Sequence, residues 1–325
     1  MSIILFDKVC LFDDINNETT IYGHYTEKFS NVSIETNSIE CYLTFSQIQK
    51  DFYITFKGKI TQLNCINFIY NNKVIKLENI NFTFPFEKCN LKLNSNSAII
   101  TTICKNYSHR LDEWIQYNLK LGFSGIVIFN NDGNINNEGN ILNNINESLN
   151  YCSNNSTIEE ICKKYEDKVV HIDMPYAPFH NLTYDNIQRI ALHIGVNAFR
   201  TKCRNIALID ADEFIYFPNN KNMNIELFCK NHSTISMKSR ILTNKNNDDI
   251  LDNNILKLAK YIGKEKYFKV ILDTSRIHKN EFINSPHEHV SQKILNDNEI
   301  IHYHCWMNAR YDYNNTMKFI DIDSI

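Results

Sequence analysis

The chain has 325 residues, with 34 Lys and Arg against 37 Asp and Glu, which gives a formal net charge of −3. Hydrophobic residues make up 43% and aromatic residues 12%, which allows a sizeable core and argues against intrinsic disorder. The near balance of charges argues against a dedicated nucleic-acid-binding protein, which would carry a strongly basic face.

The ten cysteines are scattered and none forms a C-x-x-C pair, as is typical of reduced thiols in an intracellular protein. No segment is apolar over the length needed to cross a membrane, and we find no secretory signal, so we expect a cytoplasmic protein. Heavy use of Asn, Ile, Lys and Tyr is typical of an AT-rich organism, or of a large DNA virus that encodes its own glycans and would place the protein in the host cytoplasm. No pattern indicates an oligomeric state.

Residues 1–95 carry β-strand patterns. Apolar and polar residues alternate at 41–45, 52–56, 66–70 and 80–84, and these runs are bounded by Asn, Lys and Gly. The region therefore predicts a small β-rich domain, an antiparallel sheet or sandwich, and no catalytic residues stand out in it.

Residues 96–325 begin with alternating strands and helices. Apolar or β-branched runs predict strands at 98–104, 125–129, 169–173 and 206–209. Amphipathic stretches predict a helix that Ser108 caps and that ends at Gly122, and further helices around 158–165 and at 184–200. This order predicts an α/β fold with a mainly parallel sheet flanked by helices on both faces.

Polar residues follow three of these strands. They are Cys104, Lys105 and Asn106 after the first strand, Asn131 and Asp132 after the second, and Asp210, Ala211 and Asp212 after the last. Because ligands of such sheets bind beyond the carboxyl ends of the strands, we expect these residues to face one crevice.

Asp210 and Asp212 carry the predicted chemistry. In extended backbone, residues two apart project to the same side, so the two carboxylates would repel each other unless a cation lies between them. Oxygen ligands with open positions suit Mg²⁺ or Mn²⁺ holding a phosphate. The alternative is a solvated acidic turn, but apolar runs at 206–209 and 214–217 place the pair at the edge of a core.

Five segments, in order, resemble motifs of the family 92-like glycosyltransferases and of the related family-2-like group formerly called domain of unknown function 23. They are the E-W-x-x-Y helix within 104–123, the strand 126–132, the D-x-D-E-F motif at 209–215, and the late H-E and H-Y motifs at 285–288 and 301–303. The resemblance covers residues 97–308 and implies a GT-A (Rossmann-like) fold, a nucleotide-sugar donor and a Mn²⁺ or Mg²⁺ ion. Two departures bear on donor and acceptor preference: Tyr107 stands where the family often has Glu, and His304 where it has Arg.

Several other residues are candidates for binding the donor. Asp132, or Asn131 in its place, would hydrogen-bond the base or ribose, although Asn-Asp-Gly is also a common turn. Lys105 would counter the phosphate charge, unless it is a solvated lysine at a strand end, and Lys269 would contact the diphosphate. Gln188 lies on the helix that precedes the acidic motif. It would contact the donor, or, alternatively, it lies on an exposed face of that helix without a binding role.

Two late segments are candidates for metal binding and catalysis. His302 and His304 lie on one face of a predicted strand, and either imidazole would complete the metal shell with Asp212; we favour His302 because it occupies the H-Y position. Glu288, between two histidines, is a candidate general base or acceptor-binding carboxylate, and a polar loop is its alternative.

The sequence thus predicts a metal-dependent glycosyltransferase that moves a sugar from a nucleotide-diphosphate sugar to a hydroxyl acceptor, such as a glycan or protein-linked glycan. Inversion is expected from the family resemblance. Two other classes remain open. One is a Mg²⁺-dependent phosphoester hydrolase, and the other is a non-catalytic carbohydrate-binding or assembly protein.

Overall fold

The computed structural model describes residues 3–34, 39–46, 49–105, 107–135, 141–143, 156–176, 182–220, 222–243, 261–283, 285–287, 293–296, 299–305 and 318–319. Within these residues, no helix combines the length and the apolar character needed to span a membrane.

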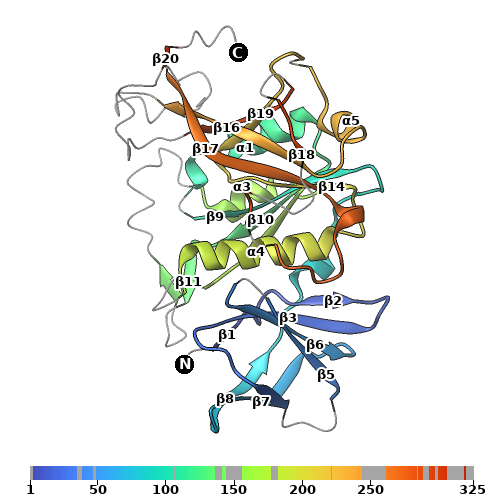
Figure 1. The fold of residues 1–325 in the computed structure, drawn as a ribbon, viewed down its shortest axis with the longest axis vertical. Coiled ribbons are helices and arrows are strands. Elements are labelled where there is room, and N and C mark those ends of the chain that lie inside the picture. Colours follow the sequence, from blue (N-terminus) through green and yellow to red (C-terminus); the bar gives the residue numbers. More distant parts are fainter. Residues whose placement is uncertain are drawn as a thin grey trace.

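The first eight strands form two antiparallel sheets at the N-terminal end of the molecule (Figure 1). The five-stranded sheet contains β1 (Ile3–Leu5), β2 (Leu11–Asp13), β3 (Glu18–Tyr25), β5 (Cys41–Phe45) and β6 (Asp51–Lys57). The three-stranded sheet contains β4 (Asn31–Ile34), β7 (Gln62–Tyr70) and β8 (Lys73–Asn81). Phe29 contacts Phe52 of β6 and Phe68 of β7 edge to face, so aromatic rings fill the space between the sheets. The domain boundary at residue 95 stays a prediction.

The rest of the chain is built on a ten-stranded mixed sheet. Its order is β13 (Val169–Asp173), β10 (Gly125–Asn130), β9 (Ala98–Cys104), β14 (Asn205–Leu208), β17 (Tyr261–Asp273), β16 (Ile235–Thr243), β19 (Ile301–Cys305) and β15 (Glu213–Tyr216). The two remaining strands are β18 (Lys293–Ile294), beside β16, and β20 (Lys318–Phe319), beside β17. A separate hairpin joins β11 (Gly133–Ile135) to β12 (Ile141–Asn143).

The expected mainly parallel, GT-A (Rossmann-like) α/β fold is wrong. β-strand accounts for 41% of the structure and helix for 20%, and the sheet forms a β-rich half-barrel. The pairings among β13, β10, β9 and β14 are parallel, but β17 pairs antiparallel with both β14 and β16, and β15 pairs antiparallel with β19. The alternation of strand and helix at 98–209 predicts parallel pairing, and that pattern does not continue through the long strands β16 and β17.

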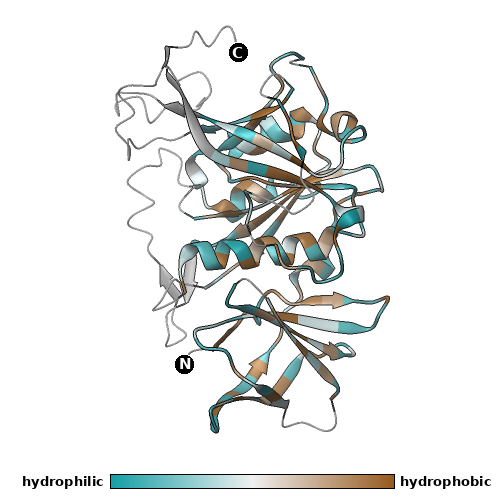
Figure 2. Ribbon diagram, viewed as in Figure 1, coloured by the Kyte–Doolittle hydropathy of each residue, from teal (hydrophilic) through white to brown (hydrophobic). Residues whose placement is uncertain are grey.

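Helices cover both faces of the parallel part of the sheet. One face packs against α1 (Ser108–Leu121), α3 (Ile158–Lys163) and α5 (Ile225–Cys229), and the other packs against α4 (Tyr184–Phe199). Two short 3-10 helices, η1 (Pro85–Lys88) and η4 (Thr274–Arg276), complete the described elements. Strands β9, β10 and β14 are mostly apolar and are buried on both faces because helices cover both (Figure 2).

Helix α4 lies between the ten-stranded sheet and the N-terminal strands (Figure 1). Thr183 caps it: its hydroxyl accepts a hydrogen bond from the backbone N–H of Asn186, whose side chain accepts one from the N–H of Thr183. The neighbours Gln188 and Arg189 contact different parts of the chain. Gln188 reaches a carboxylate beyond β14, and Arg189 forms a buried ion pair with Asp51 of β6, with 2.7 Å between Nε and Oδ2. The helix thereby links the N-terminal sheet to the candidate site.

Candidate functional site

The acidic motif forms a turn at the carboxyl end of β14. The backbone N–H of Glu213 donates to the carbonyl oxygen of Asp210 at 3.0 Å, and the N–H of Asp210 donates back to Oε2 of Glu213 at 3.0 Å. The expectation of extended backbone here is wrong, because residues Asp210 to Glu213 form a turn. The turn instead directs each carboxylate toward its own partner.

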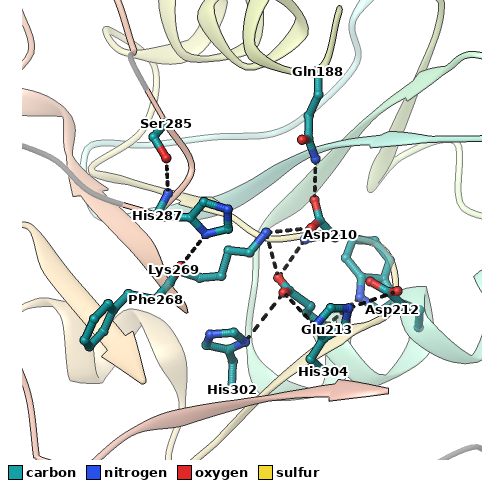
Figure 3. A network of polar contacts seen from close by, with 11 residues as sticks. Gln188, Asp210, Asp212, Glu213, Phe268, Lys269, Ser285, His287, His302 and His304 are labelled. Carbon is teal, nitrogen blue, oxygen red and sulfur yellow. Dashed lines mark hydrogen bonds and ion pairs between the residues drawn. The ribbon is translucent and has the colours of Figure 1, made fainter. Parts of the chain in front are cut away.

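Asp210 is held by two side chains (Figure 3). Nζ of Lys269 lies 2.6 Å from its Oδ2, and Nε2 of Gln188 donates to its Oδ1 at 2.7 Å. Burial alone would raise the pKa of Asp210, but the ammonium of Lys269 outweighs it and keeps this pKa below its ordinary value. Asp210 is therefore ionised, and both of its oxygens already have cationic or amide partners.

Glu213 shares the same lysine but has a different charge. Its Oε2 lies 3.2 Å from Nζ of Lys269, yet burial and the nearby charge of Asp210 raise its pKa to about 8 despite the ammonium. Lys269, with 2% of its side chain exposed, has a raised pKa because of the two carboxyl groups, which outweigh its burial. At neutral pH the three groups are thus mainly one ammonium, one carboxylate and one carboxylic acid.

Asp212 and His304 form the more open pair of the site. Nε2 of His304 lies 3.4 Å from Oδ2 of Asp212, and the two side chains are 14% and 31% exposed, respectively. The antiparallel register of β15 and β19 pairs Glu213 with His304, which places the imidazole beside the turn. Asp212 is thus adjacent to a ring nitrogen and remains partly accessible.

His302, the preferred metal ligand in the sequence prediction, lies deeper. Its side chain is fully buried, and its Nδ1 is 3.8 Å from Oε1 of Glu213. Within the described part of the chain, neither of its ring nitrogens has a hydrogen-bond partner. Burial, together with the charge of Lys269, lowers its pKa well below the ordinary value, so the ring is neutral. His304, rather than His302, is the histidine that adjoins Asp212.

The ends of β9 and β10 lie near the acidic turn. Cys104 is buried, and burial raises the pKa of its thiol, with further contributions from the nearby carboxylates of Asp132, Asp212 and Asp210. Asn131 is buried as well, and its amide donates to the carbonyl oxygens of Met174 and Tyr176 at 2.6 and 2.9 Å.

The predicted donor-binding residues differ in their contacts and in their burial. The amide of Asn131 holds the segment after β13, whereas Asp132 is half-buried near the turn. Ala211 is buried and Lys105 is half-buried. Asn106 and Glu288 lie outside the described residues.

The sequence prediction missed three residues that build this site. Glu213 is buried, and the spacing of three residues from Asp210 is the signal of a turn that would have pointed to it. Trp114 of α1 donates its indole N–H to the carbonyl oxygen of Glu213 at 2.8 Å and so positions the turn. The pKa of Tyr184, at the start of α4, is raised mainly by burial and next by the carboxylate of Asp210. This phenol therefore also borders the cluster.

No protein-family model matches the chain, and no curated protein shows significant similarity to it. The resemblance to glycosyltransferases at residues 97–308 therefore stays a prediction. Among the described residues, no three His, Cys, Asp or Glu side chains form a ready-made metal cluster.

Proposed function

We propose that the chain is a metal-dependent glycosyltransferase that moves a sugar from a nucleotide-diphosphate sugar to a hydroxyl of a glycan acceptor, with inversion. The observation that carries the proposal is the partly exposed pair of Asp212 and His304 beside the charged cluster of Lys269, Asp210 and Glu213. The sequence motifs support the same activity, and a cytoplasmic location remains part of the proposal.

The pair of Asp212 and His304 fits a divalent ion. Two donors that bind one such ion at about 2.1 Å lie roughly 3 Å apart when they are at right angles, close to the 3.4 Å between the carboxylate oxygen and the ring nitrogen. Carboxylate and imidazole together suit Mn²⁺, and carboxylate with water suits Mg²⁺. When bound, the ion would neutralise the charge that develops on the departing diphosphate.

The chain's own residues would orient the donor. Lys269 and Gln188 hold the carboxylate of Asp210 in one position, so an ionised acceptor for donor hydroxyl groups is fixed at the end of β14. Asp132 and Lys105, beyond the neighbouring strands, would contact the nucleoside and the phosphates. An acceptor hydroxyl would attack the anomeric carbon as the bond to the diphosphate breaks, and its proton would pass to a base, for which Glu288 is the candidate.

A non-catalytic carbohydrate-binding protein is the second candidate function. The observation that favours it is the position of Lys269, whose ammonium already supplies a cation to Asp210 and Glu213. In that case the chain would bind sugars without turning over a donor.

A donor screen distinguishes these functions. The purified chain is incubated with UDP-sugars or GDP-sugars and with Mn²⁺ or Mg²⁺, and the products are identified by mass spectrometry. We expect metal-dependent loss of the sugar from one donor, which Asp212→Asn lowers at least about 100-fold because it removes a charged ligand. Asp173→Asn, at the exposed end of β13, is the matched control and should retain activity. Full activity of Asp212→Asn would contradict the proposal, and cleavage of phosphodiesters instead of donors would indicate the hydrolase.

A further inference from the structure

An exposed aromatic side chain lies next to the charged cluster. Tyr267 of β17 is 60% exposed, and it stands two residues before Lys269 on the same strand. Its ring centroid is 5.2 Å from that of His287, with 35° between the two planes. An exposed tyrosine that packs on a second ring presents a broad aromatic surface to solvent.

The second ring of this pair is fixed in place. The Nδ1–H of His287 donates to the carbonyl oxygen of Phe268 at 2.7 Å, since a carbonyl can only accept. The backbone N–H of His287 donates to the hydroxyl of Ser285 at 3.0 Å. Because His287 is held at both its ring and its backbone, Tyr267 rests on a support that is organised before any ligand arrives.

The pair lies on one side of the acidic turn, and Asp132 lies on the other. His287 contacts Phe268, the residue before Lys269 on β17, and Figure 3 places it on the Lys269 side of the cluster. The sheet order runs β10, β9, β14, β17, so Asp132 follows a strand on one side of β14 and Tyr267 belongs to the strand on the other. A donor whose nucleoside lies toward Asp132 and whose diphosphate lies at the turn leaves the β17 side for the second substrate.

We propose that Tyr267 and His287 form the acceptor subsite, where they stack against the apolar face of a pyranoside ring. A pyranoside presents C–H groups on one face, and these carry a small positive charge that the negative face of an aromatic ring attracts. Stacking would also remove the exposed ring from water, which adds a hydrophobic contribution. This subsite deepens the proposed function and rests on it.

The test measures sugar binding directly. Saturation-transfer NMR on the full chain uses the methyl glycosides of glucose, galactose, mannose and N-acetylglucosamine as probes. We expect the ring C–H protons of at least one glycoside to receive saturation. Tyr267→Ala should weaken that binding about tenfold or more, whereas Tyr267→Phe should keep it. Tyr42→Ala, which removes a comparably exposed tyrosine from β5 of the N-terminal sheet, is the matched control and should bind as the native chain does.

Three results would overturn the subsite. They are the absence of binding of all four glycosides, native-like binding by Tyr267→Ala, and a loss of UDP or GDP affinity in Tyr267→Ala, which would assign the rings to the nucleobase. Failure of the proposed function is seen separately, as the absence of metal-linked donor binding by the native chain. If the native chain binds and cleaves a donor and Tyr267→Ala still binds the glycosides, the proposed function stands and only the acceptor subsite is contradicted.

Discussion

Lys269 determines the charge of the candidate site. Its ammonium is buried against Asp210 and Glu213, with distances of 2.6 and 3.2 Å to their carboxyl oxygens. The lysine lies on β17, and Asp210 follows the adjacent strand β14, so the contact depends on the antiparallel pairing of these two strands. A buried charge pair of this kind specifies an arrangement more than it adds stability.

Removing the lysine should be costly because the ionised Asp210 would lose its cationic partner while it is still about two thirds buried. Solvent reaches the exposed part of this carboxylate, so we expect Lys269→Met to lower the free energy of unfolding by roughly 1–3 kcal/mol, measured by urea denaturation at pH 7. Lys163→Met replaces a lysine on the exposed surface of α3 and should leave the urea midpoint unchanged. Equal midpoints for the two variants would contradict the assigned role of Lys269.

Glu213 should make stability depend on pH. Its pKa is about 8 in the folded protein, against an ordinary value of 4.5, so the folded state takes up a proton across this window. The resulting stabilisation is complete below pH 4.5 and is lost as the pH rises to 8. Glu213→Gln resembles the protonated acid and lacks this titration. We therefore expect the stability of the native chain relative to Glu213→Gln to fall between pH 5 and 8, by up to about 1.4 kcal/mol per pH unit.

The measurement compares urea denaturation of both chains at pH 5, 6.5 and 8. Parallel pH profiles would show that Glu213 is ionised throughout, and the protonated-acid description of the cluster would then fail.

At the scale of elements, α4 packs unusually close to the sheet. A Cβ atom on Gly195 would lie 2.2 Å from Oγ1 and 3.1 Å from Cβ of Thr101 on β9. Glycine inside a helix is unfavourable by itself, so its presence here reflects this close approach. The contact sets the depth of the helix that carries Gln188 to Asp210.

Gly195→Ala should destabilise the chain although alanine favours helix. The gain in helix propensity is about 1 kcal/mol, and the overpacking cost is roughly 1–3 kcal/mol. Thr101→Ala removes the nearest atom, so the double variant should unfold at a higher urea concentration than Gly195→Ala alone. A stabilised Gly195→Ala variant would show that the helix is not confined by β9.

Local signals predict the elements between residues 98 and 209 well. The strand at 98–104 and the helix that ends at Gly122, with a φ of 103°, are confirmed. The capping role of Ser108 is wrong, because Tyr107 is the N-cap and Ser108 is the first helical residue. The later strands lack such signals. β16 and β17 pair with each other, and β19 adds to β16 from about 60 residues downstream, so this part of the sheet depends on non-local contacts. The prediction of mainly parallel pairing failed there, because periodicity indicates a strand and does not identify its neighbour.

At the scale of the whole molecule, a buried polar cluster joins the N-terminal sheet to α4. Asp51 accepts hydrogen bonds from Nε and a terminal nitrogen of Arg189, at 2.7 and 3.1 Å, and Nδ1 of His24 lies 2.7 Å from it. His193 is buried in the same cluster, and its Nδ1 accepts a hydrogen bond from the N–H of Ile283. The N-terminal strands thus support the helix that contacts the candidate site.

His193 should make the assembled molecule sensitive to acid. Burial lowers its pKa from 6.5 to about 4, although Asp51 opposes this shift. The unfolded chain therefore binds more protons between pH 6.5 and 4, and stability falls as the pH falls through this window. We expect His193→Gln to lose less stability than the native chain between pH 6.5 and 4.5, measured by urea denaturation. Identical losses would show that another group is responsible.

The composition of the site is predictable from sequence only in part. Residue type and position in the chain are enough to select Asp210, Asp212 and Lys269 as candidates, and the structure brings them together. The choice between His302 and His304 depends on the register of β15 and β19, which no local pattern specifies. The sequence predicts that Lys269 contacts a phosphate of the donor, whereas the structure pairs it with Asp210. That pairing depends on the long strand β17 lying beside β14.

Titration calorimetry tests the central claim most directly. UDP-sugars and GDP-sugars are titrated into the native chain and into Asp212→Asn, each with and without Mn²⁺. The proposed function predicts that one donor binds the native chain with a heat that requires Mn²⁺, and that Asp212→Asn abolishes it. Donor binding that is equal with and without the metal, or equal in both chains, would contradict the claim that Asp212 and His304 hold a divalent ion on the donor diphosphate.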